Sequence, residues 1–120
     1  MKILFTDLDD TLLNNQSQVS PENKAFLDEF LADGNRLVLS SGRPLLSVME
    51  VKELAGLTQP GIFLSASNGA RVYDCDRKRT IRKIGLPLSC VSYMQEQAKE
   101  LSLHIQTYRD SDVDDAIISP

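Results

Sequence analysis

The chain has 120 residues and a mass of 13.4 kDa, which allows one ordinary domain and excludes two full ones. Its composition, 42% apolar and 25% charged, is that of a folded globular chain. Because 17 acidic residues outnumber 13 basic ones, a net charge of −4 disfavours binding to nucleic acid or to an anionic membrane. No apolar run approaches the ~20 residues that span a bilayer, and the N-terminus has no secretion signal, so we expect a cytoplasmic protein.

The first half of the chain alternates apolar runs with helical patterns. Residues 2–6, 37–39 and 62–64 are short apolar runs that predict three buried strands. Between the first two, Ser20 and Pro21 suit the N-cap and first position of a helix over residues 21–33, and Gly34 suits its end. The order β-α-β-α-β with wholly apolar strands predicts a parallel sheet covered by helices.

The second predicted helix follows the second strand. Pro44 can open it and Gly56 can close it. The spacing places four apolar residues on its inner face: Leu45, Val48, Met49 and Leu54.

After Gly69 the pattern changes, and we interpret the remainder as the start of a second unit. Residues 71–73 and 80–84 flank a polar turn and predict a β-hairpin. Ser89 can cap a further helix, and residues 103–108 alternate like a half-covered strand. Residues 110–120 form an acidic, exposed tail. The apolar face of that helix consists of Val91, Met94, Ala98 and Leu101.

Polar residues follow each of the first three strands. Asp7 and Asp9 follow the first, Ser41-Gly42-Arg43 the second and Asn68-Gly69 the third. The carboxyl ends of parallel strands meet at one edge of a sheet, where ligands bind. One carboxylate can attack an electrophilic phosphorus while a neighbouring one exchanges a proton with the leaving oxygen.

The groups after the second strand suit the same chemistry. The Ser41 hydroxyl, the adjacent backbone N–H groups and the Arg43 guanidinium are suited to phosphoryl oxygens. A magnesium ion would let a carboxylate approach a phosphate dianion, because it offsets the repulsion between like charges. The sequence therefore indicates phosphate chemistry at this edge.

Three motifs carry a resemblance to a known family. The sequence DLDDTLL at residues 7–13 resembles motif I, D-x-D-x-T, of the haloacid dehalogenase (HAD) superfamily of aspartate-nucleophile phosphatases. SGRP at residues 41–44 resembles motif II. With SNGA at residues 67–70, the spacing is similar to that of the Cof-type branch with a type IIB cap.

The resemblance implies an α/β fold, a HAD-like doubly wound parallel sheet that bears an inserted α+β cap. This chain would supply the first βαβαβ unit and the start of the cap. Residues 1–70 would form the N-terminal part of the core, residues 71–86 a hairpin and linker into the cap, and residues 87–120 the incomplete beginning of the cap.

The resemblance also assigns roles to individual residues. It makes Asp7 the nucleophile and Asp9 the general acid/base, with Mg²⁺ held by the Asp7 carboxylate and the Asp9 backbone carbonyl. Thr11 helps to fix the loop, and Asn68 belongs to the substrate pocket. The phosphate-binding set is Thr11, Ser41, Gly42 and Arg43.

The sequence departs from the family pattern in two respects. Position 10 is Asp, where the family usually has Gly. The motif III lysine and the acidic pair of motif IV, usually in a G-D-x-x-N-D setting, do not occur in the 120 residues, and Asp110-Ser111-Asp112 lacks their context. We therefore expect the chain to correspond to the first half or less of such an enzyme, and its activity alone to be negligible.

The expected function of the complete enzyme is Mg²⁺-dependent hydrolysis of a small phosphate monoester, such as a sugar phosphate, through a phospho-aspartyl intermediate. Two alternatives stay open: phosphoryl transfer of the phosphomutase type, and a catalytically incompetent fragment that only binds or self-associates. The expected partner is a small phosphorylated metabolite, without nucleic acid or membrane. An incomplete core or cap could also associate with a second copy.

Overall fold

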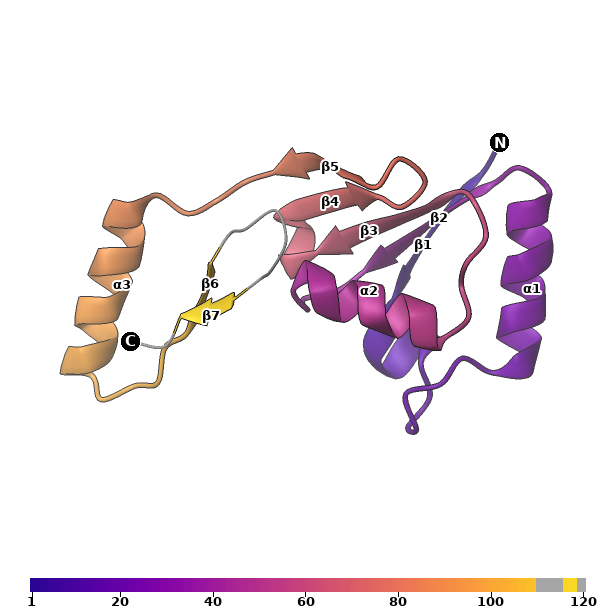
Figure 1. Cartoon of the computed structure of the whole chain (residues 1–120). Coiled ribbons are helices and arrows are strands. Elements are labelled where there is room, and N and C mark those ends of the chain that lie inside the picture. Colours follow the sequence, from indigo (N-terminus) through magenta and orange to yellow (C-terminus); the bar gives the residue numbers. More distant parts are fainter. Residues whose placement is uncertain (110–115, 119–120) are drawn as a thin grey trace. The chain divides into compact units, whose positions relative to one another are not determined.

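The structure is a computed structural model that describes residues 1–109 and 116–118 (Figure 1). The chain divides into two compact units, Met1–Lys83 and Ile84–Pro120. None of the helices in the described ranges is both long and apolar enough to cross a membrane.

The first unit is built on a five-stranded sheet with the strand order β1-β2-β3-β4-β5. The first three strands are parallel, as predicted, and the last two are antiparallel. The strands are β1 (Ile3–Asp7), β2 (Arg36–Ser40), β3 (Ile62–Ala66), β4 (Arg71–Asp74) and β5 (Arg79–Lys83). The α/β class is therefore confirmed.

Two helices connect the parallel strands and begin as the sequence predicts. In α1 (Pro21–Ala32) the Ser20 hydroxyl accepts a hydrogen bond from the Asn23 N–H at 3.1 Å. In α2 (Leu45–Leu54) Pro44 is the N-cap residue, and Gly56 follows the helix with φ of +72°. One inward assignment was wrong: Leu54, in the last turn of α2, is 82% exposed.

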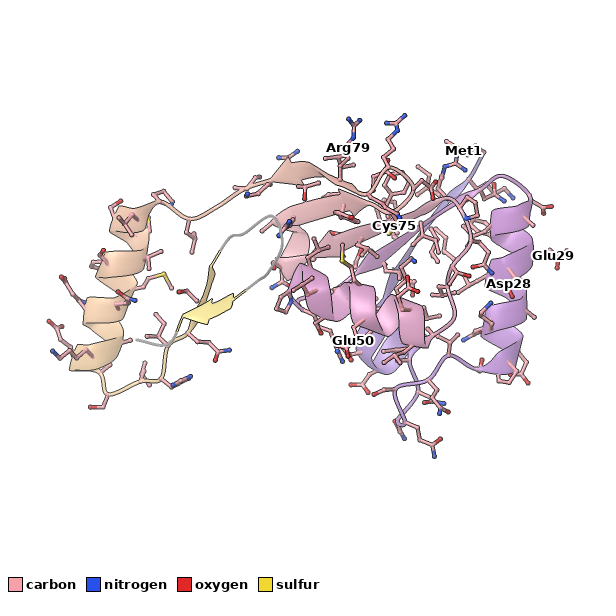
Figure 2. The ribbon with its side chains drawn as sticks, in the orientation of Figure 1. Met1, Asp28, Glu29, Glu50, Cys75 and Arg79 are labelled. Carbon is pink, nitrogen blue, oxygen red and sulfur yellow. The ribbon has the colours of Figure 1, made fainter. Side chains whose placement is uncertain are left out.

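The core of this unit lies on one face of the sheet. Leu27 and Leu31 of α1 and Leu45 and Val48 of α2 join a single buried cluster with strand residues that share a face by register, namely Leu37, Leu39, Ile62, Leu64 and Ala66. Right-handed crossovers that advance in one direction place their helices on the same face. Cys75, labelled in Figure 2, packs against this cluster.

On the opposite face of the sheet, side chains of β1 are exposed, whereas Val38 of β2 is buried. Ile3 and Phe5 of β1 are 52% and 67% exposed. We predicted that β1 would be a buried strand, which is wrong, because the face that carries Ile3 and Phe5 is not covered. β1 is also an edge strand, which pairs only with β2 in the described sheet. Only one of the two layers of a doubly wound sheet is therefore present in this unit.

The hairpin β4-β5 belongs to the same sheet, whereas we interpreted it as the start of a second unit. The chain leaves β3 through the short turn η2 (Ser67–Gly69), in which all three residues have positive φ. This turn reverses the chain, so that Arg71 pairs with Ala66 and β4 runs antiparallel to β3. An antiparallel neighbour needs only a tight turn, where a parallel one needs a long crossover.

The second unit contains α3 (Leu88–Glu100), β6 (Thr107–Arg109) and β7 (Ala116–Ile118). The helix starts after Pro87, so the prediction that Ser89 caps it was wrong. β6 occupies only the end of the predicted strand over 103–108, and β7 lies in the predicted tail and pairs with β6 antiparallel. The other tail residues, 110–115 and 119–120, lie outside the described residues.

Candidate active site

A pocket of about 290 Å³ lies at the carboxyl ends of the three parallel strands. The register sets Asp7 of β1 beside Ser40 of β2, and Ser40 beside Ser65 of β3. The lining residues are Asp7, Ser40, Ser41, Gly42, Ser65, Asn68 and Gly69. The sheet therefore presents one carboxylate among hydroxyl, amide and backbone groups, as expected for a site at the strand ends.

The segment after β1 is fixed by buried leucines. The short helical turn η1 (Leu8–Leu12) buries Leu8 and Leu12, and the Leu13 N–H donates to the Leu8 carbonyl at 2.9 Å. Within the turn, Asp9 is extended and Asp10 has φ of +59°. The buried leucines on either side of the two acids thus hold the carboxylates of the loop at the surface of the unit.

The loops that follow β2 and β3 are joined by a backbone network. The Ser41 N–H donates to the Ser65 carbonyl at 2.9 Å, and the Asn68 N–H donates to the Ser41 carbonyl at 3.0 Å. The Arg43 N–H donates to the Ser41 hydroxyl at 3.1 Å. That hydroxyl, on a residue only 7% exposed, keeps its own O–H for donation. These bonds preorganise the wall of the pocket.

Gly42 is required by a close approach. A Cβ at this position would lie 3.1 Å from Oδ1 of Asn68, which is tighter than ordinary van der Waals contact. A side chain here would require the Asn68 amide to shift by a few tenths of an ångström. The close contact with Asn68 therefore explains why the position between Ser41 and Arg43 suits a residue without a side chain.

Asp9 and Arg43 form a bidentate ion pair. Arg43 Nε donates to Asp9 Oδ2 at 2.9 Å and Nη2 donates to Oδ1 at 2.7 Å. A third bond, from Nη1 to the Ser47 hydroxyl at 3.2 Å, orients the guanidinium. The hydrogen bonds from Arg43 lower the pKa of Asp9 below its usual value, and the smaller effect of burial acts in the opposite direction.

The structure brings together part of the predicted site. Asp7, Ser41, Gly42 and Asn68 share the pocket. Asp9 and Arg43 do not line it, although each lies within two residues of a lining residue, and they bind each other. Thr11 lines two other hollows. One runs along the segment that follows Thr11, and the other lies between β1 and α1.

Sequence reasoning missed Ser40, Ser65 and the ion pair. A usable signal existed for the two serines, since each is a polar residue near the end of an otherwise apolar strand. The pair between Asp9 and Arg43 spans 34 positions, and spacing alone does not reveal it. We predicted that the Arg43 guanidinium binds the substrate phosphate, and that role stays a prediction.

The oxygen donors at the site are of the type that binds a magnesium ion, although there are few of them. The Asp7 carboxylate and the Asp9 backbone carbonyl are hard oxygen donors, the kind that Mg²⁺ prefers, and Mg²⁺ commonly retains several waters. Within the described residues, however, no three acidic, histidine or cysteine side chains gather into a metal site. The Asp9 carboxylate is engaged by Arg43.

Comparisons with known proteins agree with this architecture. The model of the haloacid dehalogenase-like hydrolase family matches residues 4–116. The chain therefore belongs to the haloacid dehalogenase-like hydrolases, and the resemblance drawn from its three motifs is confirmed. The type IIB cap stays a prediction.

Two of the relatives that the chain matches are named as phosphatases. The chain is 39% identical to phosphatase YwpJ of Bacillus subtilis over 62% of this chain and 25% of that protein. It is 32% identical to the B. subtilis 5-amino-6-(5-phospho-D-ribitylamino)uracil phosphatase YcsE over 70% of this chain and 32% of that protein. The chain thus spans about a quarter to a third of these relatives.

Solved structures share the fold. A haloacid dehalogenase-like hydrolase from B. subtilis matches with a TM-score of 0.83 and 28% identity, over 100% of this chain and 39% of that one. A second, from Bacteroides thetaiotaomicron, matches with a TM-score of 0.77 and 31% identity, over 89% of this chain and 40% of that one.

Proposed function

We propose that these residues form the nucleophile-bearing part of a phosphatase that hydrolyses small phosphate monoesters through a phospho-aspartyl intermediate. The observation that carries the proposal is the Asp7 carboxylate at the end of β1, in a pocket shared with Ser41 and Asn68. Family membership and relatives named as phosphatases support it.

In the first step, an Asp7 oxygen attacks the phosphorus of the substrate. A bond forms between that oxygen and phosphorus while the ester P–O bond breaks, and the leaving alkoxide takes a proton from the carboxyl group of Asp9. Because the ion pair with Arg43 keeps Asp9 ionised, Asp9 must leave Arg43 and take up a proton from solvent before this step. The Ser41 hydroxyl and the Gly42 N–H donate hydrogen bonds to the phosphoryl oxygens, since the N–H groups of Ser41 and Arg43 already donate to Ser65 and Ser41.

In the second step, water attacks the phosphorus of the phospho-aspartyl group. The bond from phosphorus to the Asp7 oxygen breaks and releases inorganic phosphate, while the water's proton passes to the Asp9 carboxylate. Asp9 thus recovers the proton it gave to the alcohol, and both residues return to their initial states.

Magnesium belongs to this proposal. The Asp7 carboxylate and the Asp9 carbonyl would hold it, and when bound it would offset the repulsion between Asp7 and a phosphate dianion. The name of one relative supports the substrate class, since YcsE is named as the phosphatase of a phosphorylated small molecule. We propose a small phosphorylated metabolite here too.

Binding without turnover is a second candidate for the 120 residues alone. It is favoured by the few metal donors in the described part of the chain and by the engagement of Asp9 with Arg43. A phosphomutase-type transfer would need a site that admits an acceptor hydroxyl and excludes water, and the same assay distinguishes it through the fate of the phosphoryl group.

The test is hydrolysis of an aryl phosphate in Mg²⁺ by the full polypeptide that contains these residues, compared with its Asp7→Asn variant. The amide has nearly the same shape as the carboxylate but is a poor nucleophile, so activity should vanish while the fold is kept. The matched control is Asp10→Asn, which removes a neighbouring exposed carboxylate and should keep activity. An Asp7→Asn variant with more than a few per cent of wild-type activity would exclude Asp7 as the nucleophile.

A further inference from the structure

The pocket at the strand ends lacks a positive charge. Among the described residues that line it, Asp7 is acidic and the others are serines, glycines and an asparagine. A phosphate dianion next to the Asp7 carboxylate is repelled unless a cation approaches. Arg43 is one residue from the lining Gly42, and its own N–H and carbonyl bind the pocket wall through Ser41 and Ser67.

The guanidinium of Arg43 is held by Asp9 instead. The fork geometry, with both Asp9 oxygens at 2.7 and 2.9 Å, is the one by which arginine also binds phosphate. The pair is accessible, since the side chains of Arg43 and Asp9 are 34% and 49% exposed. An accessible ion pair contributes little net free energy, so a phosphate group can compete for the same donors.

We propose that Asp9 and a substrate phosphate compete for the Arg43 guanidinium, so that phosphate entry breaks the ion pair and frees the Asp9 carboxylate. This inference rests on the proposed function and adds a positioning role for Arg43 within it. With the site empty, Arg43 holds Asp9 at the border of the pocket. With phosphate bound, Arg43 faces the phosphoryl oxygens and Asp9 is released toward the leaving group.

In an alternative arrangement, phosphate would bind Arg43 without displacing Asp9. Arginine has five N–H donors, and the contacts to Asp9 and Ser47 use three of them. Phosphate could bond the remaining two while Asp9 stays in place. In that arrangement Asp9 would help to hold Arg43, and its removal would not strengthen binding beyond the effect of one lost negative charge.

The experiment measures the binding of inorganic phosphate to the 120-residue chain by calorimetry and by ¹⁵N NMR. If Asp9 competes, Asp9→Asn binds phosphate about two- to fivefold more tightly than wild type, the factor that corresponds to an exposed ion pair. The control Asp10→Asn removes the same charge one residue away without touching Arg43, and asparagine tolerates the positive φ there. It should bind phosphate less tightly than Asp9→Asn does.

A double-mutant cycle with Arg43→Gln completes the design. In the Arg43→Gln background, Asp9→Asn should give no more gain than Asp10→Asn, because the shared guanidinium is gone. In the wild type, phosphate should also shift the Arg43 Nε–Hε signal toward its position in Asp9→Asn.

Each outcome bears on the exchange. Equal gains in Asp9→Asn and Asp10→Asn, or weaker binding in Asp9→Asn, would overturn it, while phosphate-induced shifts of the Asp7 and Ser41 amides would still support the phosphatase site. If phosphate shifts none of these amides in any variant, the pocket is no phosphate site, and the proposed function fails together with the exchange.

Discussion

In the unit Met1–Lys83, Leu37, Leu39 and Leu64 of the sheet have no exposed surface, whereas in the unit Ile84–Pro120 Leu101 and Leu103 are 65% and 63% exposed. The buried residue of α3 is Ala98, a small side chain. The first unit thus packs helices against a sheet, and the second presents an apolar helix face with little cover. Chemistry that needs fixed geometry belongs to the first unit, and every proposed catalytic residue lies in it.

The largest effect expected in this comparison is a loss of turnover on substitution of Asp9, a residue of the first unit. Because general acid/base catalysis is worth about 10²–10⁴ in rate, Asp9→Asn should lower turnover of an aryl phosphate in the complete enzyme by that factor. Pre-steady-state kinetics should show that both phosphorylation of Asp7 and its hydrolysis slow down. A rate that does not respond to the change across pH 5 to 9 would place the acid/base group elsewhere.

The next effect compares the two units by stability. Leu64→Ala removes a fully buried side chain from β3 and should cost about 2–5 kcal/mol of unfolding free energy. Leu101→Ala, at an exposed position after α3, should change it by less than about 0.5 kcal/mol. Urea unfolding followed by circular dichroism measures both. Similar losses of unfolding free energy in the two variants would show that the second unit also has a buried core, contrary to the comparison.

The fold shows what the sequence could and could not predict. Local signals, such as Ser20-Pro21 at a helix start and Gly56 at a helix end, predicted the boundaries of α1 and α2, because a cap depends mainly on neighbouring residues. The same kind of signal failed at Ser89, since α3 starts after Pro87. The burial of β1 was mispredicted, because its apolar run does not reveal which of its faces is covered. Coverage depends on segments far away in the sequence.

The candidate site divides in the same way. Asp7, Ser41 and Asn68 were predictable because each follows a recognisable strand, and parallel strands end at one edge. The pairing of Asp9 with Arg43 was not, because it depends on the orientation of two long side chains from different loops. The partners of a charged group follow from the packed loops rather than from spacing.

The uncovered regions of both units predict self-association. Exposed apolar faces and an unpaired strand edge favour pairing with another copy, so we expect the 120-residue chain to oligomerise at micromolar concentrations in sedimentation. Phe5→Gln removes a 67% exposed side chain from β1 and should weaken association through the sheet. Leu101→Gln should weaken it if the second unit is the interface. A monomer at all concentrations would contradict both.

The smallest expected effect concerns Cys75, whose thiol packs against the core of the first unit. Burial raises its pKa from 9.0 to about 11. The unfolded chain therefore releases this proton at lower pH than the folded one, and the stability that Cys75 contributes is complete below pH 9 and declines as pH rises toward 11. Relative to Cys75→Ala, the wild type should lose about 1 kcal/mol of unfolding free energy between pH 8 and pH 10, measured by urea unfolding. The matched control is Cys90→Ala, which removes an exposed thiol from α3 and should keep the wild-type pH dependence. If the unfolding free energy of the wild type changed with pH as that of Cys75→Ala does, Cys75 would be open to water. The core of the first unit would then be less closed around Cys75 than the contrast between the two units requires.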